Sequence, residues 1–228
     1  MRSRGPSQPC WIDRRAAGQE LASRLASQAA PSDSTILVAL PRGGVAVAAE
    51  LARQLRLPLT TWAVRKLALP SSPEFAIGAL APGEVVLWDP SSSQGLLHDP
   101  DLRRRILERE SRELRRRQQL FGDARPDQLR HRELILVDDG IATGLTAQAA
   151  LVSLRQLQPR QLILAVPVAA SQALQTLRQL VDEVVVLAEL DDLIAVGCHY
   201  LRFDQLSDAD VLALLDGCRL PSPAAAPS

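Results

Sequence analysis

Aromatic residues, cysteines and long apolar runs are all scarce in this chain. Aromatic residues make up 3% of its 228 residues, which argues against the RNA-binding proteins that stack single-stranded bases on aromatic side chains. The three cysteines, Cys10, Cys198 and Cys218, are isolated and odd in number, so the sequence predicts neither a disulfide framework nor a zinc site. The chain contains no run of 18 apolar residues, which argues against a membrane-spanning helix.

Net charge is also lacking, because 26 basic and 26 acidic residues balance, so no overall basic field points to nucleic acid. Residues 1–10 are polar, contain proline and glycine, and lack the apolar core of a secretory signal. We expect residues 1–10 to form a disordered lead, residues 221–228 a disordered Pro/Ala tail, and residues 11–220 a single domain. The expected location is the reducing cytoplasm, without membrane contact.

Lysine is almost absent among the cations. Of the 26 basic residues, 25 are arginine, and the single lysine is Lys66. This imbalance has two interpretations. Base composition alone could produce it, or position 66 requires a compact, rotatable ammonium group where the planar guanidinium of arginine does not serve.

Apolar strands alternate with amphipathic helices along the chain, a pattern typical of βαβ units. Strands are expected at residues 35–40, 59–64, 75–80, 85–88, 134–137, 162–166 and 183–187. Helices are expected at residues 12–28, 45–55, 101–119, 147–157, 171–180 and 208–215. Residues 67–73 contain proline and serine and are expected to be mobile. The sequence therefore predicts an α/β fold whose mostly parallel, twisted sheet is flanked by helices.

The segment of residues 134–146 is the most informative part of the chain. Four apolar residues lead into Asp138 and Asp139, and a loop of glycine and threonine then precedes a helix. Ligands of open α/β sheets bind where strands end and helices begin, and helix N-termini there bind phosphate. Two carboxylates would repel a bare anion, so a ligand with hydroxyl groups or a bound cation fits better. A phosphorylated sugar with Mg²⁺ meets these demands; an ordinary turn with two capping aspartates is the alternative.

Four segments together resemble the type I phosphoribosyltransferases, and in particular a poorly characterised group within that family. They are P-R-G-G-V at 41–45, V-R-K-L at 64–67, E-F-A-I-G-A at 74–79 and V-D-D-G-I-A-T-G at 137–144. The resemblance extends over about residues 12–215. It implies the type I fold with a small hood or lid subdomain, and the substrate 5-phosphoribosyl 1-pyrophosphate (PRPP). Members are often dimeric, so a homodimer is a candidate assembly.

The resemblance also implies roles for the acidic segment. Asp138 and Asp139 would hold the 2′- and 3′-hydroxyls of the ribose. The loop that follows would wrap the 5′-phosphate, and it consists of Ala142, Thr143, Gly144, Leu145 and Thr146. Mg²⁺ would be bound mainly through the ligand and water, with Asp138 and Asp139 as the candidate protein ligands.

A second set of residues is implied to bind the pyrophosphate. Arg42, Gly43 and Gly44 follow the first expected strand, where the resembled family has a loop that often contains a non-proline cis peptide. Arg65 and Lys66 end the second expected strand, where several members carry basic residues followed by a flexible lid. Taken alone, R-G-G is typical of an ordinary turn, and Arg65 could be a solvated surface cation.

The implied reaction is PRPP-dependent phosphoribosyl transfer to a nitrogen acceptor, a nucleobase or a related amine, with release of pyrophosphate. Asp138, Asp139, Lys66 and Arg42 are the candidate catalytic residues. A PRPP- or nucleotide-sensing regulatory module and a hydrolase of a phosphoribosyl compound are the alternatives. The Arg-rich helix at 101–119 is interpreted either as a solvated helix with i,i+4 ion pairs or as a basic face for pyrophosphate or a dimer partner.

The acceptor is the open part of this assignment. Ala142 stands where 6-oxopurine transferases usually carry an aspartate, so the chain resembles the adenine or orotate branches more closely there. Gly140 stands where the family usually has an apolar residue. His199, Tyr200 and Phe203 either contribute to an acceptor-binding hood or pack a small C-terminal subdomain.

Overall fold

The computed structural model describes residues 10–28, 31–32, 34–69, 71–90 and 99–219. The chain ends that are expected to be disordered lie outside the described residues, apart from Cys10, whose backbone N–H donates to the carbonyl of His199 at 2.8 Å. No helix within the described ranges is long and apolar enough to cross a membrane.

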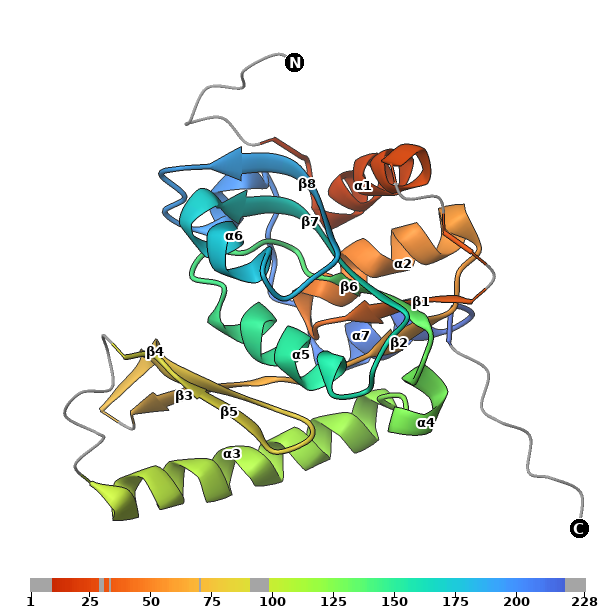
Figure 1. Ribbon diagram of the computed structural model, residues 1–228. Helices are drawn as coiled ribbons and strands as arrows, with labels where there is room; N and C mark the ends of the chain where they lie inside the picture. The colour runs from red at the N-terminus through yellow and green to blue at the C-terminus, as the bar shows by residue number, and fades with distance from the viewer. Residues whose placement is uncertain (1–9, 29–30, 33, 70, 91–98, 220–228) are drawn as a thin grey trace, which may run out of the picture.

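A five-stranded sheet forms the centre of the molecule, with the strand order β2-β1-β6-β7-β8 and parallel pairing throughout (Figure 1). The strands are β1 (Thr35–Ala39), β2 (Leu59–Thr61), β6 (Glu133–Val137), β7 (Gln161–Ala170) and β8 (Glu183–Leu190). Every residue of β1 and β6 is buried, as is typical of parallel strands covered on both faces. The expected α/β class with a mostly parallel sheet is confirmed.

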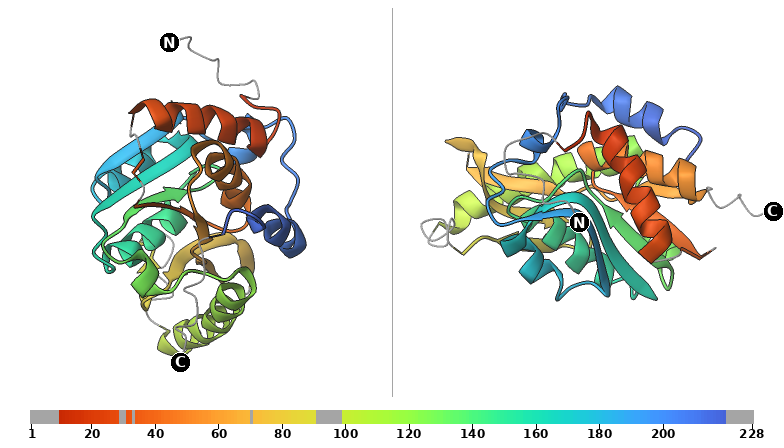
Figure 2. Two further views of the ribbon diagram at one scale, coloured as in Figure 1. Left: turned by 90° about the vertical axis from the view of Figure 1, so that its right-hand side faces the viewer. Right: turned by 90° about the horizontal axis from the view of Figure 1, so that it is seen from above.

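Helices cover both faces of this sheet. One face carries α1 (Arg14–Gln28), α2 (Gly43–Leu55) and α7 (Asp208–Leu215), and Figure 2 shows α7 beside α2. The other carries α4 (Pro126–Leu129), α5 (Leu145–Arg155) and α6 (Ser171–Leu177). Because successive strand residues point to opposite faces, Ile135 packs with the first group and Leu134 with the second.

The helices after β1 and β6 leave the sheet on opposite faces. The two strands are direct neighbours, with Ala39 opposite Val137 at their ends. β1 leads into α2, and β6 leads into α5. In open α/β sheets, adjacent strands whose helices diverge in this way leave a crevice at their carboxyl ends, and ligands bind there.

A second, antiparallel sheet forms a separate layer. Its strands are β3 (Arg65–Leu69), β4 (Ser72–Ala81) and β5 (Val85–Trp88). The sheet lies between α5 and the long helix α3 (Pro100–Phe121), as Figures 1 and 2 show. Leu67 and Ile77 pack against Ile106 of α3 in this layer. The expected hairpin at 75–80 and 85–88 is confirmed, and it turns through Gly83 at a φ of 75°.

Two expectations about residues 59–73 are wrong. The strand expected at 59–64 ends at Thr61, and residues 67–69 are not part of a mobile segment but belong to β3. Asp123 explains the change, because its carboxylate accepts hydrogen bonds from the Thr61 hydroxyl (2.6 Å) and the Ala63 N–H (2.7 Å). These bonds turn the chain out of the first sheet. Leu67 is then buried in the second.

Four of the eight arginines of helix α3 form ion pairs with acidic residues of the same helix. Arg104 pairs with Asp101 at 2.8 Å, and Glu113 pairs with both Arg116 (2.8 Å) and Arg117 (3.0 Å). These contacts follow the i,i+3 and i,i+4 spacing of a helix surface. They agree with the interpretation of a solvated helix that covers a sheet with its few apolar residues.

Candidate functional site

The turn after β1 and the acidic pair after β6 lie in direct contact. A Cβ atom on Gly44 would lie 2.7 Å from the carbonyl oxygen of Val137 and 2.9 Å from Cα of Asp138. A Cβ atom on Gly43 would overlap the carboxylate of Asp139. Glycine is therefore required in this turn because the backbones approach so closely. The peptide bond between Pro41 and Arg42 is cis.

Two helix N-termini border this contact. α2 begins at Gly43 and α5 begins at Leu145, and neither N-cap residue makes a side-chain hydrogen bond. The N-cap residue of α5 is Gly144, whose φ of 79° is favourable for glycine. The first N–H groups of a helix have no partner within the helix, and the positive end of its dipole favours anions. The crevice therefore combines two anion-binding helix ends with two carboxylates.

The two carboxylates are buried side by side. Oδ1 of Asp138 accepts a hydrogen bond from the backbone N–H of Asp139 at 2.9 Å. Burial and the neighbouring carboxylate of Asp139 raise the pKa of Asp138 well above its ordinary value. Burial also raises the pKa of Asp139, an effect that the guanidinium of Arg14 opposes. Clustered carboxyl groups with raised pKa values are typical of binding and catalytic sites.

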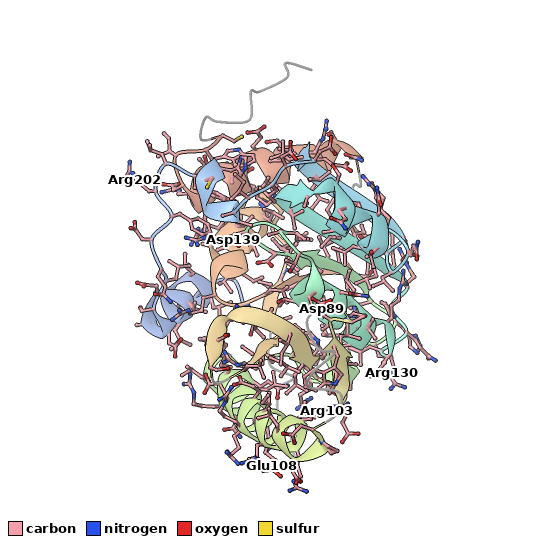
Figure 3. All side chains as sticks on the ribbon, turned by 90° about the vertical axis from the view of Figure 1, so that its left-hand side faces the viewer. Asp89, Arg103, Glu108, Arg130, Asp139 and Arg202 are labelled. Carbon is pink, nitrogen blue, oxygen red and sulfur yellow. The ribbon has the colours of Figure 1, made fainter. Side chains whose placement is uncertain are left out.

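Lys66 lies at a cavity of about 640 Å³ beside the expected 5′-phosphate loop. The residues that line it include Lys66 of β3, Thr143 of the loop, and Leu145 and Thr146 of α5. Asp138 and Asp139 are not among its lining residues. In Figure 3, Asp139 lies between Arg202 of the C-terminal segment and Asp89, which also lines the cavity. The structure thus brings the single lysine to the expected 5′-phosphate loop.

The family model of the phosphoribosyl transferase domain matches residues 13–202. The chain belongs to the phosphoribosyl transferase family. Two Mycobacterium tuberculosis proteins, from strains CDC 1551 and H37Rv and provisionally named phosphoribosyl transferases, are 38% identical to it over 205 residues. That alignment covers 90% of this chain but 46% of each relative, so the chain spans about half the length of the curated relatives it matches.

A solved structure has a similar fold over the whole length of its own chain. It is the crystal structure of TT1426 from Thermus thermophilus, which is 37% identical and superposes with a TM-score of 0.70. The superposition covers 92% of this chain and 99% of TT1426. The parallel sheet and its helices are therefore those of a type I phosphoribosyltransferase.

Sequence reasoning missed one residue that contacts the acidic pair. Nε of Arg14, the first residue of α1, donates to Oδ2 of Asp139 at 2.7 Å. The guanidinium also lies over the ring of Phe203, 3.7 Å from its centroid. Arg14 is one of 25 arginines and is 125 residues from its partner. No local pattern in the sequence distinguishes it from the others.

Tyr200 and Phe203 pack together at the acidic pair. Their rings are stacked with centroids 5.0 Å apart. The hydroxyl of Tyr200 donates to the backbone carbonyl of Asp139 at 2.6 Å. Burial, followed by the charge of Asp139, raises the pKa of Tyr200, which keeps the proton on this donor. These two residues therefore pack the C-terminal segment, which is one of the two roles that the sequence allows. They pack it directly against the acidic pair.

The unusual glycine after the acidic pair has a packing reason. A Cβ atom on Gly140 would lie 2.5 Å from Cγ1 of Val196 and 2.9 Å from Cγ1 of Val168. Val196 begins η2 (Val196–His199). The side chain of His199 is buried, which lowers its pKa, and its Nδ1 lies 3.8 Å from Sγ of Cys10. An apolar side chain at position 140 would displace this C-terminal segment from the loop.

The remaining basic candidates point elsewhere. Nε of Arg65 donates to Oε2 of Glu110 in α3 at 2.9 Å, and Nη2 forms an ion pair with the same oxygen at 2.8 Å. Nη1 of Arg42 lies 3.9 Å from Oδ1 of Asp208, at the start of α7. The structure therefore separates Arg65 from its neighbour Lys66, and it leaves Arg42 next to the crevice with a long, weak ion pair.

Proposed function

We propose that this chain transfers the phosphoribosyl group of PRPP to a nitrogen acceptor and releases pyrophosphate. The observation that supports the proposal best is the contact between the glycine turn at 43–44 and the acidic pair at 138–139. A ligand that satisfies both must offer hydroxyl groups to carboxylates and phosphate groups to helix N-termini within one molecule. PRPP has both kinds of group on one ribose.

The proposal assigns the ribose 5-phosphate part to the β6 side of the crevice. The 5′-phosphate accepts hydrogen bonds from the N–H groups at the start of α5. The side chains of Thr143 and Thr146 lie beside it at the cavity. The ribose hydroxyls donate to Asp138 and Asp139. Binding energy from the phosphate and the hydroxyls then orients the anomeric carbon for reaction.

The β1 side of the crevice would hold the pyrophosphate. Gly43 and Gly44 start α2, so their N–H groups belong to an uncapped helix N-terminus. Arg42 would stabilise from this side the negative charge that grows on the departing pyrophosphate, and we expect Lys66 to act on the same charge from the cavity beside Thr143. The C–O bond to pyrophosphate breaks as the acceptor nitrogen bonds to the same carbon, and the acceptor loses its proton. The carboxylates favour the positive charge that develops on the ribose ring.

The residues present are compatible with Mg²⁺. No group of three or more His, Cys, Asp or Glu in the described parts of the chain is placed to hold a metal ion. The oxygen atoms of Asp138 and Asp139 are nevertheless the hard ligands that Mg²⁺ prefers, and it commonly binds through one or two carboxylates together with substrate phosphates and water. When bound, Mg²⁺ would supply positive charge to the pyrophosphate oxygens.

Calorimetric titration with PRPP, with and without Mg²⁺, tests the proposal. We expect Mg²⁺-dependent binding, and Asp139→Asn should weaken it at least tenfold, or about 1.4 kcal/mol. Asp138→Asn should likewise weaken binding. Unchanged affinity in both variants would refute the assignment of the acidic pair.

The next step screens nucleobases and related amines for pyrophosphate release. Release that requires one acceptor identifies the transferase and its substrate. Binding without turnover of any acceptor would favour the PRPP-sensing module instead. Release of ribose 5-phosphate without an added base would favour the hydrolase.

A further inference from the structure

Arg14 is buried against the acidic pair, although none of the motif segments contains it. The side chains of Arg14 and Asp139 are 11% and 15% exposed, and Nε of the arginine lies 2.7 Å from Oδ2 of the carboxylate. Ion pairs this well shielded from water are much stronger than those on a surface. The pair also joins α1 to the loop after β6, which are far apart in the sequence.

The guanidinium of Arg14 is held from several directions. Its Nη1 donates to the backbone carbonyl of Asp204 at 2.9 Å. Its plane lies over Phe203, whose ring is itself stacked on Tyr200. A planar guanidinium has little freedom to rotate when two of its nitrogen atoms donate hydrogen bonds and an aromatic ring packs against its flat face.

Asp139 is consequently fixed at both its side chain and its backbone. Arg14 binds Oδ2, and the hydroxyl of Tyr200 binds the backbone carbonyl. Gly43 provides the space for the carboxylate, because any side chain there would overlap it. Among the described residues, no other residue donates a hydrogen bond to Oδ1 of Asp139, whereas Oδ1 of Asp138 accepts one from the backbone N–H of Asp139. Each carboxylate therefore keeps one oxygen atom for a ligand.

The charges at the acidic pair also indicate a role for Arg14 in holding Asp139. Two carboxylates on adjacent residues repel each other, and the crevice must also accept the phosphates of a ligand. Arg14 places a positive charge 2.7 Å from Oδ2 of Asp139, which offsets part of this repulsion and fixes the orientation of the carboxylate. Preorganised groups of this kind bind more tightly because little ordering is left for the moment of binding.

We propose that Arg14 is a positioning residue for ribose recognition, which holds Asp139 through Oδ2 so that Oδ1 accepts a ribose hydroxyl. This inference rests on the proposed function. It extends the site to α1 and to the C-terminal segment of residues 200–204, which would then serve PRPP binding as well as packing.

A double-mutant cycle on PRPP affinity tests the inference. Calorimetry with Mg²⁺ and PRPP would compare the wild type, Arg14→Gln, Asp139→Asn and the double variant. We expect Arg14→Gln to weaken binding about tenfold in the wild-type background and less than twofold in the Asp139→Asn background, because Arg14 acts through Asp139. Arg14→Lys should recover part of the loss, since it restores the charge.

Arg15→Gln is the matched control. Arg15 is the next residue of α1, its side chain is 73% exposed, and it pairs with Glu50 at 3.5 Å, so its replacement should leave PRPP affinity unchanged. Should Arg14→Gln fail to fold, Phe203→Leu removes the platform under the guanidinium and is expected to weaken binding at least threefold.

The outcomes separate the two proposals. If the wild type does not bind PRPP, the proposed function fails and the role of Arg14 fails with it. If the wild type binds and Arg14→Gln has the same affinity, the positioning role alone is wrong. An equal loss in both backgrounds overturns it as well, because Arg14 would then act on the fold and not through Asp139.

Discussion

Arg65 and Lys66 are consecutive residues of β3 whose side chains serve opposite faces of the three-stranded sheet. Lys66 lines the cavity beside Thr143, whereas Arg65 forms an ion pair with Glu110 of α3 that includes a hydrogen bond from its Nε. Alternation along a strand produces this separation. It divides a pair of cations that looks equivalent in the sequence into one candidate ligand-binding group and one structural group.

Replacing each of these two cations should therefore have a different effect. We expect Lys66→Met to weaken pyrophosphate and PRPP binding at least tenfold. Arg65→Met should change affinity less than threefold, but it should lower the free energy of unfolding by about 1–3 kcal/mol because buried Glu110 loses a partner and retains only Arg109. Calorimetry and urea denaturation measure the two effects, and the reverse pattern would contradict the placement.

The two glycines of the turn after β1 should respond differently to alanine. In Gly44→Ala the new Cβ meets backbone atoms of Val137 and Asp138, so we expect a loss of about 1–3 kcal/mol of stability. In Gly43→Ala the atoms nearest the Cβ all belong to the Asp139 carboxylate, so the carboxylate is displaced from its contact with Arg14, and PRPP affinity should fall about tenfold with a smaller loss of stability.

Gly217 supplies the control for both glycine variants. Its φ is 78°, and a Cβ atom there would meet no atom within 4 Å. Gly217→Ala should therefore cost about 1 kcal/mol through the left-handed backbone alone, with PRPP affinity retained. Equal losses of affinity in all three alanine variants would mean that the turn has no special relation to the acidic pair.

Stability should fall with pH in the range where Asp123 titrates. Burial raises the pKa of this carboxyl from 3.8 to about 6, against the opposing hydrogen bonds from Ala63 and Thr61. A raised native pKa means that the folded state binds the proton more tightly, so this contribution is full below pH 3.8 and is lost as the pH rises to about 6.

Urea denaturation between pH 4 and pH 7 measures this contribution. The difference between wild type and Asp123→Asn isolates it from the other carboxyl groups, and its total change should be on the order of 1–3 kcal/mol. A parallel pair of profiles would show that Asp123 has an ordinary pKa in the folded protein.

Ser153 of α5 joins the segment after β2 to the turn between β4 and β5 through two hydrogen bonds. Its hydroxyl donates to the carbonyl of Pro82 at 2.5 Å and accepts from Nε1 of Trp62 at 3.1 Å. Ser153→Ala leaves both groups without this partner, so we expect a loss of about 1–3 kcal/mol in unfolding free energy and unchanged PRPP affinity. Ser23→Ala, at an exposed position of α1, should stay within about 0.5 kcal/mol of the wild type.

Most of the parallel sheet and both ligand loops could be predicted from short segments. Residues 134–137 are apolar without interruption and are followed at once by Asp138 and Asp139, so strand, acidic pair and loop are encoded within about a dozen neighbouring positions. The turn at 42–44 likewise follows its strand directly. Such features depend on local pattern and on the rule that sheet ligands bind at carboxyl strand ends.

Contacts between distant segments could not be predicted in this way. The chain leaves the first sheet after Thr61 because Asp123, just after α3, accepts hydrogen bonds from Thr61 and Ala63. No sequence pattern near position 61 predicts this contact. Residues 67–69 look like part of a loop beside proline and serine, yet they form a strand because α3 supplies an apolar cover. Tertiary packing overrides local propensity most readily in such short strands.

The sequence by itself determined the α/β class, the phosphoribosyltransferase motifs and the residues of the acidic pair, because each depends on a pattern of neighbouring residues. Only the tertiary structure decided that Lys66 and not Arg65 lies at the cavity beside Thr143 and Thr146, and that Arg14 binds Asp139. The physical reason is that a strand's register and a helix's docking are set by burial summed over many residues. One arginine among 25 acquires its role only when that burial has placed it.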